Sequence, residues 1–171
     1  EVVILAVPVY YGRVPEEAAS WLSSLTARDT PAVLVVVYGN REYDDALKEL
    51  SDIATAGNFV PVAGAAFIGE HSYSTSERPI AQNRPDESDL GKAREFGAAV
   101  REKLINKASI DDIEPLTVPG NVPYVEPKNL MMLKEARKHV PLTPETDEEL
   151  CTQCGECVEA CPTGAIDSDD I

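Results

Sequence analysis

Three apolar runs in the first half of the chain predict buried β-strands. Residues 2–7 and 32–38 are unbroken stretches of aliphatic side chains rich in β-branched residues, and residues 59–68 form a third apolar run. Unbroken runs are typical of parallel strands covered on both faces, because a strand with one solvated face alternates apolar and polar residues. The pattern therefore predicts three strands of one parallel sheet.

A segment with helical periodicity follows each predicted strand. Pro15 suits the first position of one helix, Asp44 or Asp45 could cap a second that Gly57-Asn58 would end, and residues 86–107 form a third. Strands that alternate with helices predict right-handed crossovers and an α/β fold. The side chains expected to face inward are Ala18, Trp21, Leu22 and Leu25, then Ala46, Leu47, Leu50, Ile53 and Ala54, then Leu90, Ala93, Phe96, Val100 and Leu104.

Prolines recur after the third helix, around a short helical candidate at Asn129–His139. We interpret this stretch as a linker that packs irregularly on the core. The predicted organisation is an α/β domain at residues 1–107, a Pro-rich linker at 108–149 and a cysteine-containing segment at 150–171.

Composition places the chain among soluble globular proteins. It has 171 residues, 43% of them hydrophobic, which suffices for one core and an appendage. There is no apolar stretch long enough to cross a bilayer and no secretory signal at the start. The few cysteines are gathered in one cluster, which favours a reducing compartment. We therefore expect a cytoplasmic protein without a membrane span, best suited to an oxygen-poor cell.

Negative charge is concentrated near the C-terminus. The formal net charge is −15, and no Lys or Arg occurs from residue 141 onward. An acidic surface repels nucleic acid and favours encounter with a basic face on a redox partner, by steering that salt weakens. The alternative is that the charge serves only solubility.

The four cysteines form the most specific motif in the chain. Cys151, Cys154, Cys157 and Cys161, followed by Pro162, give the spacing Cys-x2-Cys-x2-Cys-x3-Cys-Pro. Bacterial ferredoxins use this run to hold 4Fe-4S clusters, because thiolates spaced by two residues can converge on a cubic cluster from one tight turn. The motif predicts electron transfer.

Two other chemistries compete for these thiols. Four thiolates also suit tetrahedral zinc, although zinc sites usually present two pairs separated by a longer loop. A thioredoxin-like pair is disfavoured because nothing upstream of Cys151 reads as a strand. In two-cluster ferredoxins the fourth cysteine of the run ligates the other cluster, whose remaining ligands come from a second run. No second run follows here, so we expect that the C-terminus is cut.

Three loop segments, at residues 7–15, 37–47 and 66–72, resemble strand-end loops of the flavodoxin–ferredoxin fusion proteins. The similarity extends through the Pro-rich linker into the cysteine run. It implies a flavodoxin-like sheet of order 2-1-3-4-5, of which the third to fifth strands would be present and the first strands missing. It also implies that flavin mononucleotide (FMN) is a cofactor beside the 4Fe-4S clusters.

The resemblance places two of these loops on either side of the flavin ring, with aromatic side chains that could stack on it and glycines that admit backbone amides. The phosphate loop of the family, after the first strand, is not in this sequence. Alternatively, Tyr38 and Tyr43 cap the core and Gly39 serves a turn. Arg13 and Arg41 could face a phosphate, a flavin carbonyl or an acidic neighbour, and the sequence does not choose among these three partners. His71 reads as a loop hydrogen-bonder rather than an acid or base. The flavin-binding residues implied are Tyr10, Tyr11, Gly12, Arg13, Tyr38, Gly39, Asn40, Arg41 and Tyr43.

The sequence thus predicts an electron carrier that passes electrons between flavin and 4Fe-4S clusters and on to a redox partner. We favour a carrier over a substrate-reducing flavoenzyme, because the sequence shows no signature of a substrate pocket and we assign no catalytic residue. The alternative is a flavin-free flavodoxin-like scaffold that docks an iron–sulfur or zinc module onto a partner protein.

Overall fold

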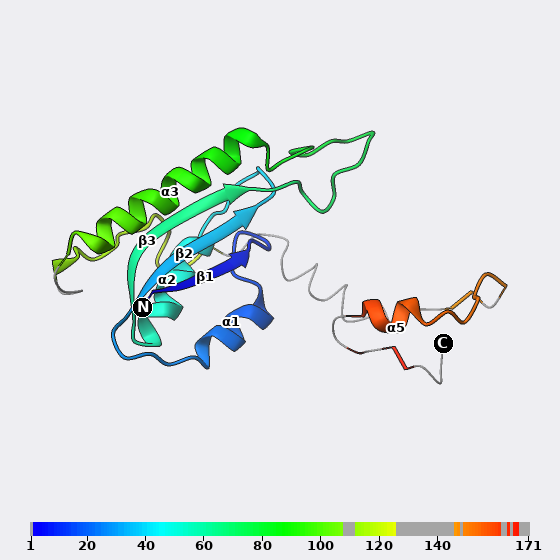
Figure 1. The fold of residues 1–171 in the computed structure, drawn as a ribbon, viewed down its shortest axis with the longest axis horizontal. Helices are drawn as coiled ribbons and strands as arrows, with labels where there is room; N and C mark the ends of the chain where they lie inside the picture. The colour runs from blue at the N-terminus through cyan, green and yellow to red at the C-terminus, as the bar shows by residue number, and fades with distance from the viewer. Residues whose placement is uncertain are drawn as a thin grey trace. The chain divides into compact units, whose positions relative to one another are not determined.

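The computed structural model describes residues 2–107, 112–125, 146–147, 149–161, 164 and 166–167. It divides into two compact units, Glu1–Leu130 and Met131–Ile171, and Figure 1 shows the elements of each. The first unit holds a sheet and its helices, and the second holds the cysteines. The domain boundaries expected at residues 107 and 149 stay predictions.

The sheet of the first unit has three parallel strands, as the apolar runs predict. They are β1 (Val3–Pro8), β2 (Thr30–Tyr38) and β3 (Phe59–Ile68), in the order β1-β2-β3. The central strand β2 is the most buried, with Ala32, Leu34 and Val36 fully enclosed. The α/β class is confirmed, whereas the flavodoxin-like identity stays a prediction.

Helices α1 (Glu16–Ser23) and α2 (Ala46–Ala56) cover one face of the sheet. The main core lies between them and the strands. Leu50 and Ala54 of α2 are buried there against Leu34 and Val36 of β2. Helix α2 presents its apolar stripe to the sheet. Its polar side therefore faces away from the sheet and can contact the strand-end loops and the linker.

Helix α3 (Glu87–Ile105) packs on the opposite face, over β3 (Figure 1). Phe96 meets Phe67 edge to face, with 5.9 Å between ring centroids, and the Lys103 ammonium donates to the Val62 carbonyl oxygen at 2.7 Å. This helix does not reach across to β1, where Ile4 is 66% exposed. Strand β1 is therefore covered on one face, not on both as its apolar run suggests.

Two expected core residues are on the surface. Trp21 is 64% exposed, because the short helix α1 buries the neighbouring Leu22 instead. Leu90 is 38% exposed, because the first turn of α3 turns Asp89 inward. Asp89 forms a capping box with Asp86 and accepts hydrogen bonds from the Arg84 guanidinium.

The ends of α2 differ from the expected caps. Asp45 occupies the N-cap position, but its side chain makes no capping bond. At the C-terminal end the left-handed residue is Asn58, with φ = +59°, while Gly57 has φ = −82°. Gly57 is needed for space, because a Cβ there would lie 2.8 Å from the Leu25 carbonyl oxygen.

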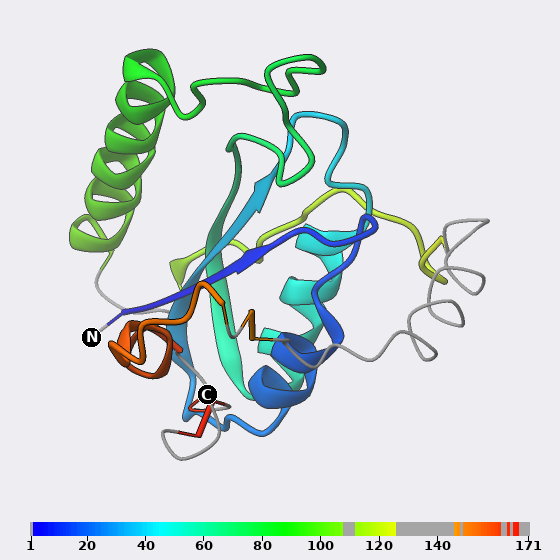
Figure 2. The same ribbon diagram turned by 90° about the vertical axis from the view of Figure 1, so that its right-hand side faces the viewer.

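The described part of the linker, residues 112–125, is irregular, belongs to the first unit and packs on its core. Ile113 is buried, and Leu116 and Val118 pack against the main core. Figure 2 shows this yellow-green segment passing beside α2. The helical candidate at Asn129–His139 lies outside the described residues.

Candidate iron–sulfur centre and strand-end loops

The cysteine segment contains one short helix, α5 (Glu156–Ala160). Cys157 lies on this helix, Cys151 and Cys154 precede it, and Cys161 follows it. Cys154 and Cys157 are exposed and the outer two are half-buried, and the four cysteines form no disulfide. All four therefore remain available as thiolate ligands.

The backbone around the cysteines turns sharply between them. Gln153 and Gly155 adopt left-handed conformations, with φ of +54° and +77°, on either side of Cys154. A hydrogen bond from the Glu156 backbone amide, with another from the Thr152 side chain, lowers the pKa of the Cys154 thiol. Amides directed at sulfur stabilise the thiolate, which is the form that binds iron.

The spacing and chemistry of this donor set fit 4Fe-4S ligation of the ferredoxin type. Within the described residues, no group of three or more Cys, His, Asp or Glu side chains is gathered closely enough to hold a metal ion. Such thiolates repel one another and converge when a metal bonds them, because metal binding and local folding are coupled. The assignment of the four cysteines as ligands therefore stays a prediction.

The loop after β1 is a tight hairpin. Tyr10 and Arg13 exchange two backbone hydrogen bonds of 3.0 Å, and the intervening Tyr11 and Gly12 have φ of +55° and +79°. These are the conformations of a two-residue turn whose central residues are both left-handed. The turn leaves Tyr10 56% exposed and Tyr11 half-buried.

The two glycines expected at the flavin are approached by side chains of this chain instead. A Cβ at Gly12 would lie 2.3 Å from an Asp44 carboxylate oxygen, and one at Gly39 would lie 2.2 Å from Cδ2 of His71. Neither position presents an open cradle of the kind that a flavin ring needs. The glycines let neighbouring loops approach closely, so FMN binding at these positions would require Asp44 and His71 to move.

The loop after β2 supports the structural alternative for its tyrosines. Tyr38 and Tyr43 stack edge to face at 5.5 Å, and Tyr43 packs against the main core. Asn40 is left-handed, with φ = +61°. His71 accepts a hydrogen bond at Nδ1 from the Tyr73 amide at 3.0 Å, as expected of a loop hydrogen-bonder.

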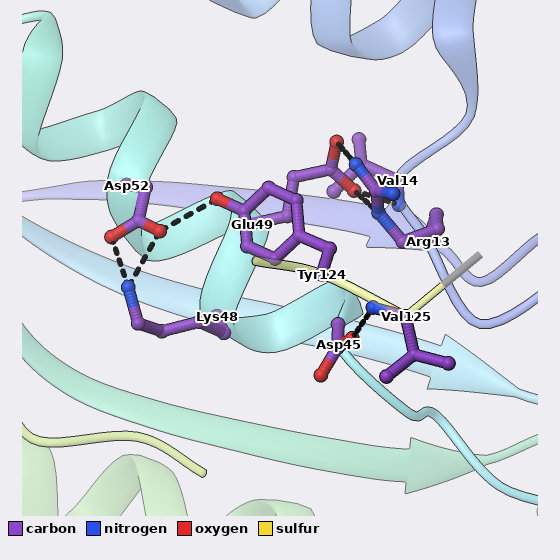
Figure 3. Close-up of polar contacts among 8 residues, drawn as sticks. All are labelled: Arg13, Val14, Asp45, Lys48, Glu49, Asp52, Tyr124 and Val125. Carbon is purple, nitrogen blue, oxygen red and sulfur yellow. Dashed lines mark hydrogen bonds and ion pairs between the residues drawn. The ribbon is translucent and has the colours of Figure 1, made fainter. Parts of the chain in front are cut away.

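Both arginines of the loops face carboxylates. Arg13 forms a bidentate pair with Glu49 of α2, at 2.7 and 2.8 Å, and Glu49 also accepts from the Val14 amide at 2.9 Å (Figure 3). Arg41 pairs with Asp44 at the surface. Of the three partners that the sequence left open, the structure shows acidic neighbours.

A row of polar residues on α2, which sequence reasoning missed, joins these loops to the linker. We call it the α2 polar stripe, and it consists of Asp45, Lys48, Glu49 and Asp52, spaced along one side of the helix. Figure 3 shows Tyr124 of the linker lying over it. The amphipathic pattern predicts only a solvated helix face here, so nothing in the sequence marks the contacts of these residues with Arg13 and the linker.

Each contact along the stripe has an electrostatic consequence. Burial raises the pKa of Asp45, but hydrogen bonds from the Val125 and Asn121 amides outweigh burial and lower it overall. Burial likewise opposes, without overcoming, the lowering of the Asp52 pKa by Lys48 and Tyr124. Burial and the bond to Asp52 raise the pKa of Tyr124, so this phenol stays protonated, and a hydrogen-bond donor, beyond the pH at which a free tyrosine ionises.

A cavity of about 390 Å³ opens beside the stripe, at the carboxyl ends of β1 and β2. Its walls come from the two strand-end loops, the start of α2 and the linker. The lining residues are Tyr11, Arg41, Glu42, Asp44, Asp45, Gly120, Asn121 and Val125.

Comparison with known families identifies the cysteine segment. Residues 144–167 match the 4Fe-4S binding domain family (Fer4), over the range that includes all four cysteines. This match supports a 4Fe-4S cluster and iron–sulfur electron transfer, and it does not extend to the α/β unit. No curated protein and no solved structure matches the chain.

Among the described residues, no helix has the length and apolarity that a bilayer crossing requires.

Proposed function

We propose that this chain is an electron-transfer protein whose cysteine segment carries the redox centre and whose α/β unit is its scaffold. The observation that carries the proposal is the family match over residues 144–167, centred on the Cys-x2-Cys-x2-Cys-x3-Cys run. A bound 4Fe-4S cluster supplies one-electron chemistry. Cys151, Cys154, Cys157 and Cys161 are the proposed ligands.

The protein tunes such a centre through hydrogen bonds, exposure and charge. The amide of Glu156 and the hydroxyl of Thr152 stabilise the Cys154 thiolate. Cys154 and Cys157 are exposed, which suits short-range transfer to a partner. The acidic residues described around them, including Glu156 and Glu159, favour a redox partner with a basic face.

The scaffold role of the α/β unit is favoured by its filled loops. Asp44 and His71 occupy the space over Gly12 and Gly39, and Arg13 is engaged with Glu49. The residues of these loops are thus engaged in contacts within the α/β unit, and these contacts account for the loop sequences without a flavin.

The second candidate adds FMN at the same loops, passing electrons to the cluster. Two observations on the loop after β1 favour it: Tyr10 is 56% exposed, and the neighbouring Tyr11 lines the cavity of about 390 Å³. The order β1-β2-β3 also agrees with the last three strands of the flavodoxin order. Binding would require the side chains over both glycines to move.

One experiment separates these functions. The chain is purified without oxygen, its ultraviolet–visible spectrum is recorded before and after dithionite, and iron, sulfide, zinc and flavin are quantified. Broad absorbance that bleaches on reduction, with iron and sulfide present and flavin absent, supports the scaffold form. Structured flavin bands in addition would support the second candidate. A colourless protein that contains zinc would overturn electron transfer.

A further inference from the structure

The last described part of the linker lies along α2 and is held mainly by polar contacts. We call residues 120–125 the strap. The Asp45 carboxylate, 1% exposed, accepts bonds from the Asn121 amide at 2.7 Å, the Asn121 side chain at 2.9 Å and the Val125 amide at 2.7 Å. One carboxylate thus holds both ends of the strap, as Figure 3 shows for Val125.

A second fastening lies between these bonds. The Tyr124 hydroxyl donates to Asp52 at 2.6 Å, and the Arg13 guanidinium lies 4.3 Å from the Tyr124 ring centroid. Arg13 is itself fixed by Glu49. The strap is therefore tied both to α2 and to the loop after β1.

Apolar burial contributes little to the strap itself. Val122 and Val125 are 78% and 60% exposed, whereas Leu116 and Val118 just upstream pack against the main core. When the strap leaves, water can replace its bonds to Asp45, so the net cost of release is far below the strength of the bonds themselves. Segments with few buried apolar contacts are the ones that open locally.

A natural hinge lies at the upstream end. Gly120 has φ = +152°, a conformation that side chains rarely adopt. A Cβ there would lie 2.4 Å from Cβ of Lys48, an atom too close to the helix backbone to move aside. Gly120 therefore sets how closely the strap can seat on α2.

The strap also forms a wall of the cavity, since Gly120, Asn121 and Val125 are among its lining residues. We propose that the strap is a lid, hinged at Gly120 and latched on the Asp45 carboxylate, whose release opens the cavity at the carboxyl ends of β1 and β2. The proposal does not depend on what the cysteines bind.

Hydrogen–deuterium exchange of the full chain tests the latch at the amides that Asp45 holds. Asp45→Asn replaces an acceptor oxygen by an NH₂ group and removes the charge, so we expect the Asn121 and Val125 amides to exchange at least 10-fold faster, while Leu50 stays protected. Glu42→Gln, at an exposed residue lining the same cavity, should leave all three unchanged. Unchanged exchange at Asn121 and Val125 in Asp45→Asn would overturn the latch.

A second pair of variants tests the hinge without altering the buried charge. Gly120→Ala should unseat the strap and speed the same two amides several-fold, whereas Gly97→Ala, where a Cβ meets no atom within 4 Å, should not. Should Asp45→Asn unfold the protein, this pair still decides the question. Equal exchange in both variants would refute the hinge.

Opening of the cavity is measured by hydroxyl-radical footprinting of the tyrosines after β1. In Gly120→Ala, oxidation of Tyr11 should rise at least twofold because Tyr11 lines the cavity, while the already exposed Tyr10 provides the internal reference. A constant ratio of Tyr11 to Tyr10 oxidation, with the strap amides exchanging fast, would show that the strap moves without opening the cavity.

Discussion

The two units of the chain obtain their order from different sources. In the α/β unit, Leu34, Leu50 and Val36 are completely enclosed by apolar neighbours. In the cysteine unit, no described residue is buried, and Leu150 is 78% exposed. On the proposed function, ligation of a metal cluster by the cysteines supplies the order of this segment, because metal binding and local folding are coupled. The comparison teaches that the described apolar core and the proposed redox centre lie in separate parts of this molecule.

The largest expected effect removes a ligand. Cys157→Ser should abolish the 4Fe-4S absorbance and most bound iron, because serine replaces a thiolate ligand, while the thermal unfolding of the α/β unit stays the same. Iron and sulfide analysis with circular dichroism measures both. Glu156→Gln, at the adjacent exposed residue, is the control and should keep its iron. Wild-type iron content in Cys157→Ser would remove this cysteine from the ligand set.

The next largest effect is expected in the α/β unit, where a core side chain is removed and the cysteine unit is left unchanged. Leu50→Ala deletes a fully buried side chain and should lower the free energy of unfolding by about 2–5 kcal/mol, measured by urea denaturation. The iron content of the folded protein should not change. Leu150→Ala makes the same substitution at an exposed site of the cysteine unit, and should cost less than about 0.5 kcal/mol. Loss of iron in Leu50→Ala would show that the units depend on each other.

Acidic pH should lower the free energy of unfolding of the α/β unit, because two of its aspartates have lowered pKa values. Hydrogen bonds from Arg84 hold the pKa of Asp89 well below 3.8, and the strap amides lower that of Asp45 despite its burial. Because these folded-state pKa values lie below the unfolded ones, the stabilisation is complete above about pH 4 and is lost as pH falls through the folded values. Urea midpoints between pH 3 and 7 should therefore fall towards acid.

The contribution of Asp89 can be isolated by substitution. Asp89→Asn should be less stable than the wild type at pH 7, and its urea midpoint should decline less towards pH 3. Glu42→Gln, which carries no such contacts, should follow the wild-type curve. A parallel decline in Asp89→Asn and the wild type would contradict the assignment.

The smallest effect adds stability to one unit only. Gly97→Ala lies in α3, where an added Cβ meets nothing within 4 Å. Alanine restricts the unfolded chain and favours the helix, so we expect a gain of about 0.5–1 kcal/mol in urea denaturation. Iron content and cluster absorbance should be identical to wild type. Destabilisation would mean that α3 is not helical at Gly97.

The sequence predicts well those features that depend on short stretches of the chain. Unbroken apolar runs located β1, β2 and β3, and the cysteine spacing located the segment that matches the 4Fe-4S binding domain family. Helical periodicity predicted the wrong side chains at Trp21 and Leu90. The short helix α1 buries the neighbouring Leu22, and the capped first turn of α3 buries the neighbouring Asp89.

The polar arrangement could not be predicted, because its partners are far apart in the chain. Asp45 meets Asn121 and Val125 across 76 and 80 residues, and Arg13 meets Glu49 across 36. The α2 polar stripe has the ordinary pattern of a solvated helix face. The resemblance assigns Gly12 and Gly39 to the approach of backbone amides to a flavin. That Asp44 and His71 lie over them instead depends on how neighbouring loops approach, which the sequence does not show.

The distance in sequence between Asp45 and its strap also has a consequence for biosynthesis. While the chain is being made, helix α2 emerges before the residues that will enclose its first carboxylate. Asp45 then remains hydrated until the ribosome has added the 80 residues that lead to Val125. The polar side of α2 is thus left in water during early folding and is covered late, so the nascent chain does not have to bury an unpaired charge.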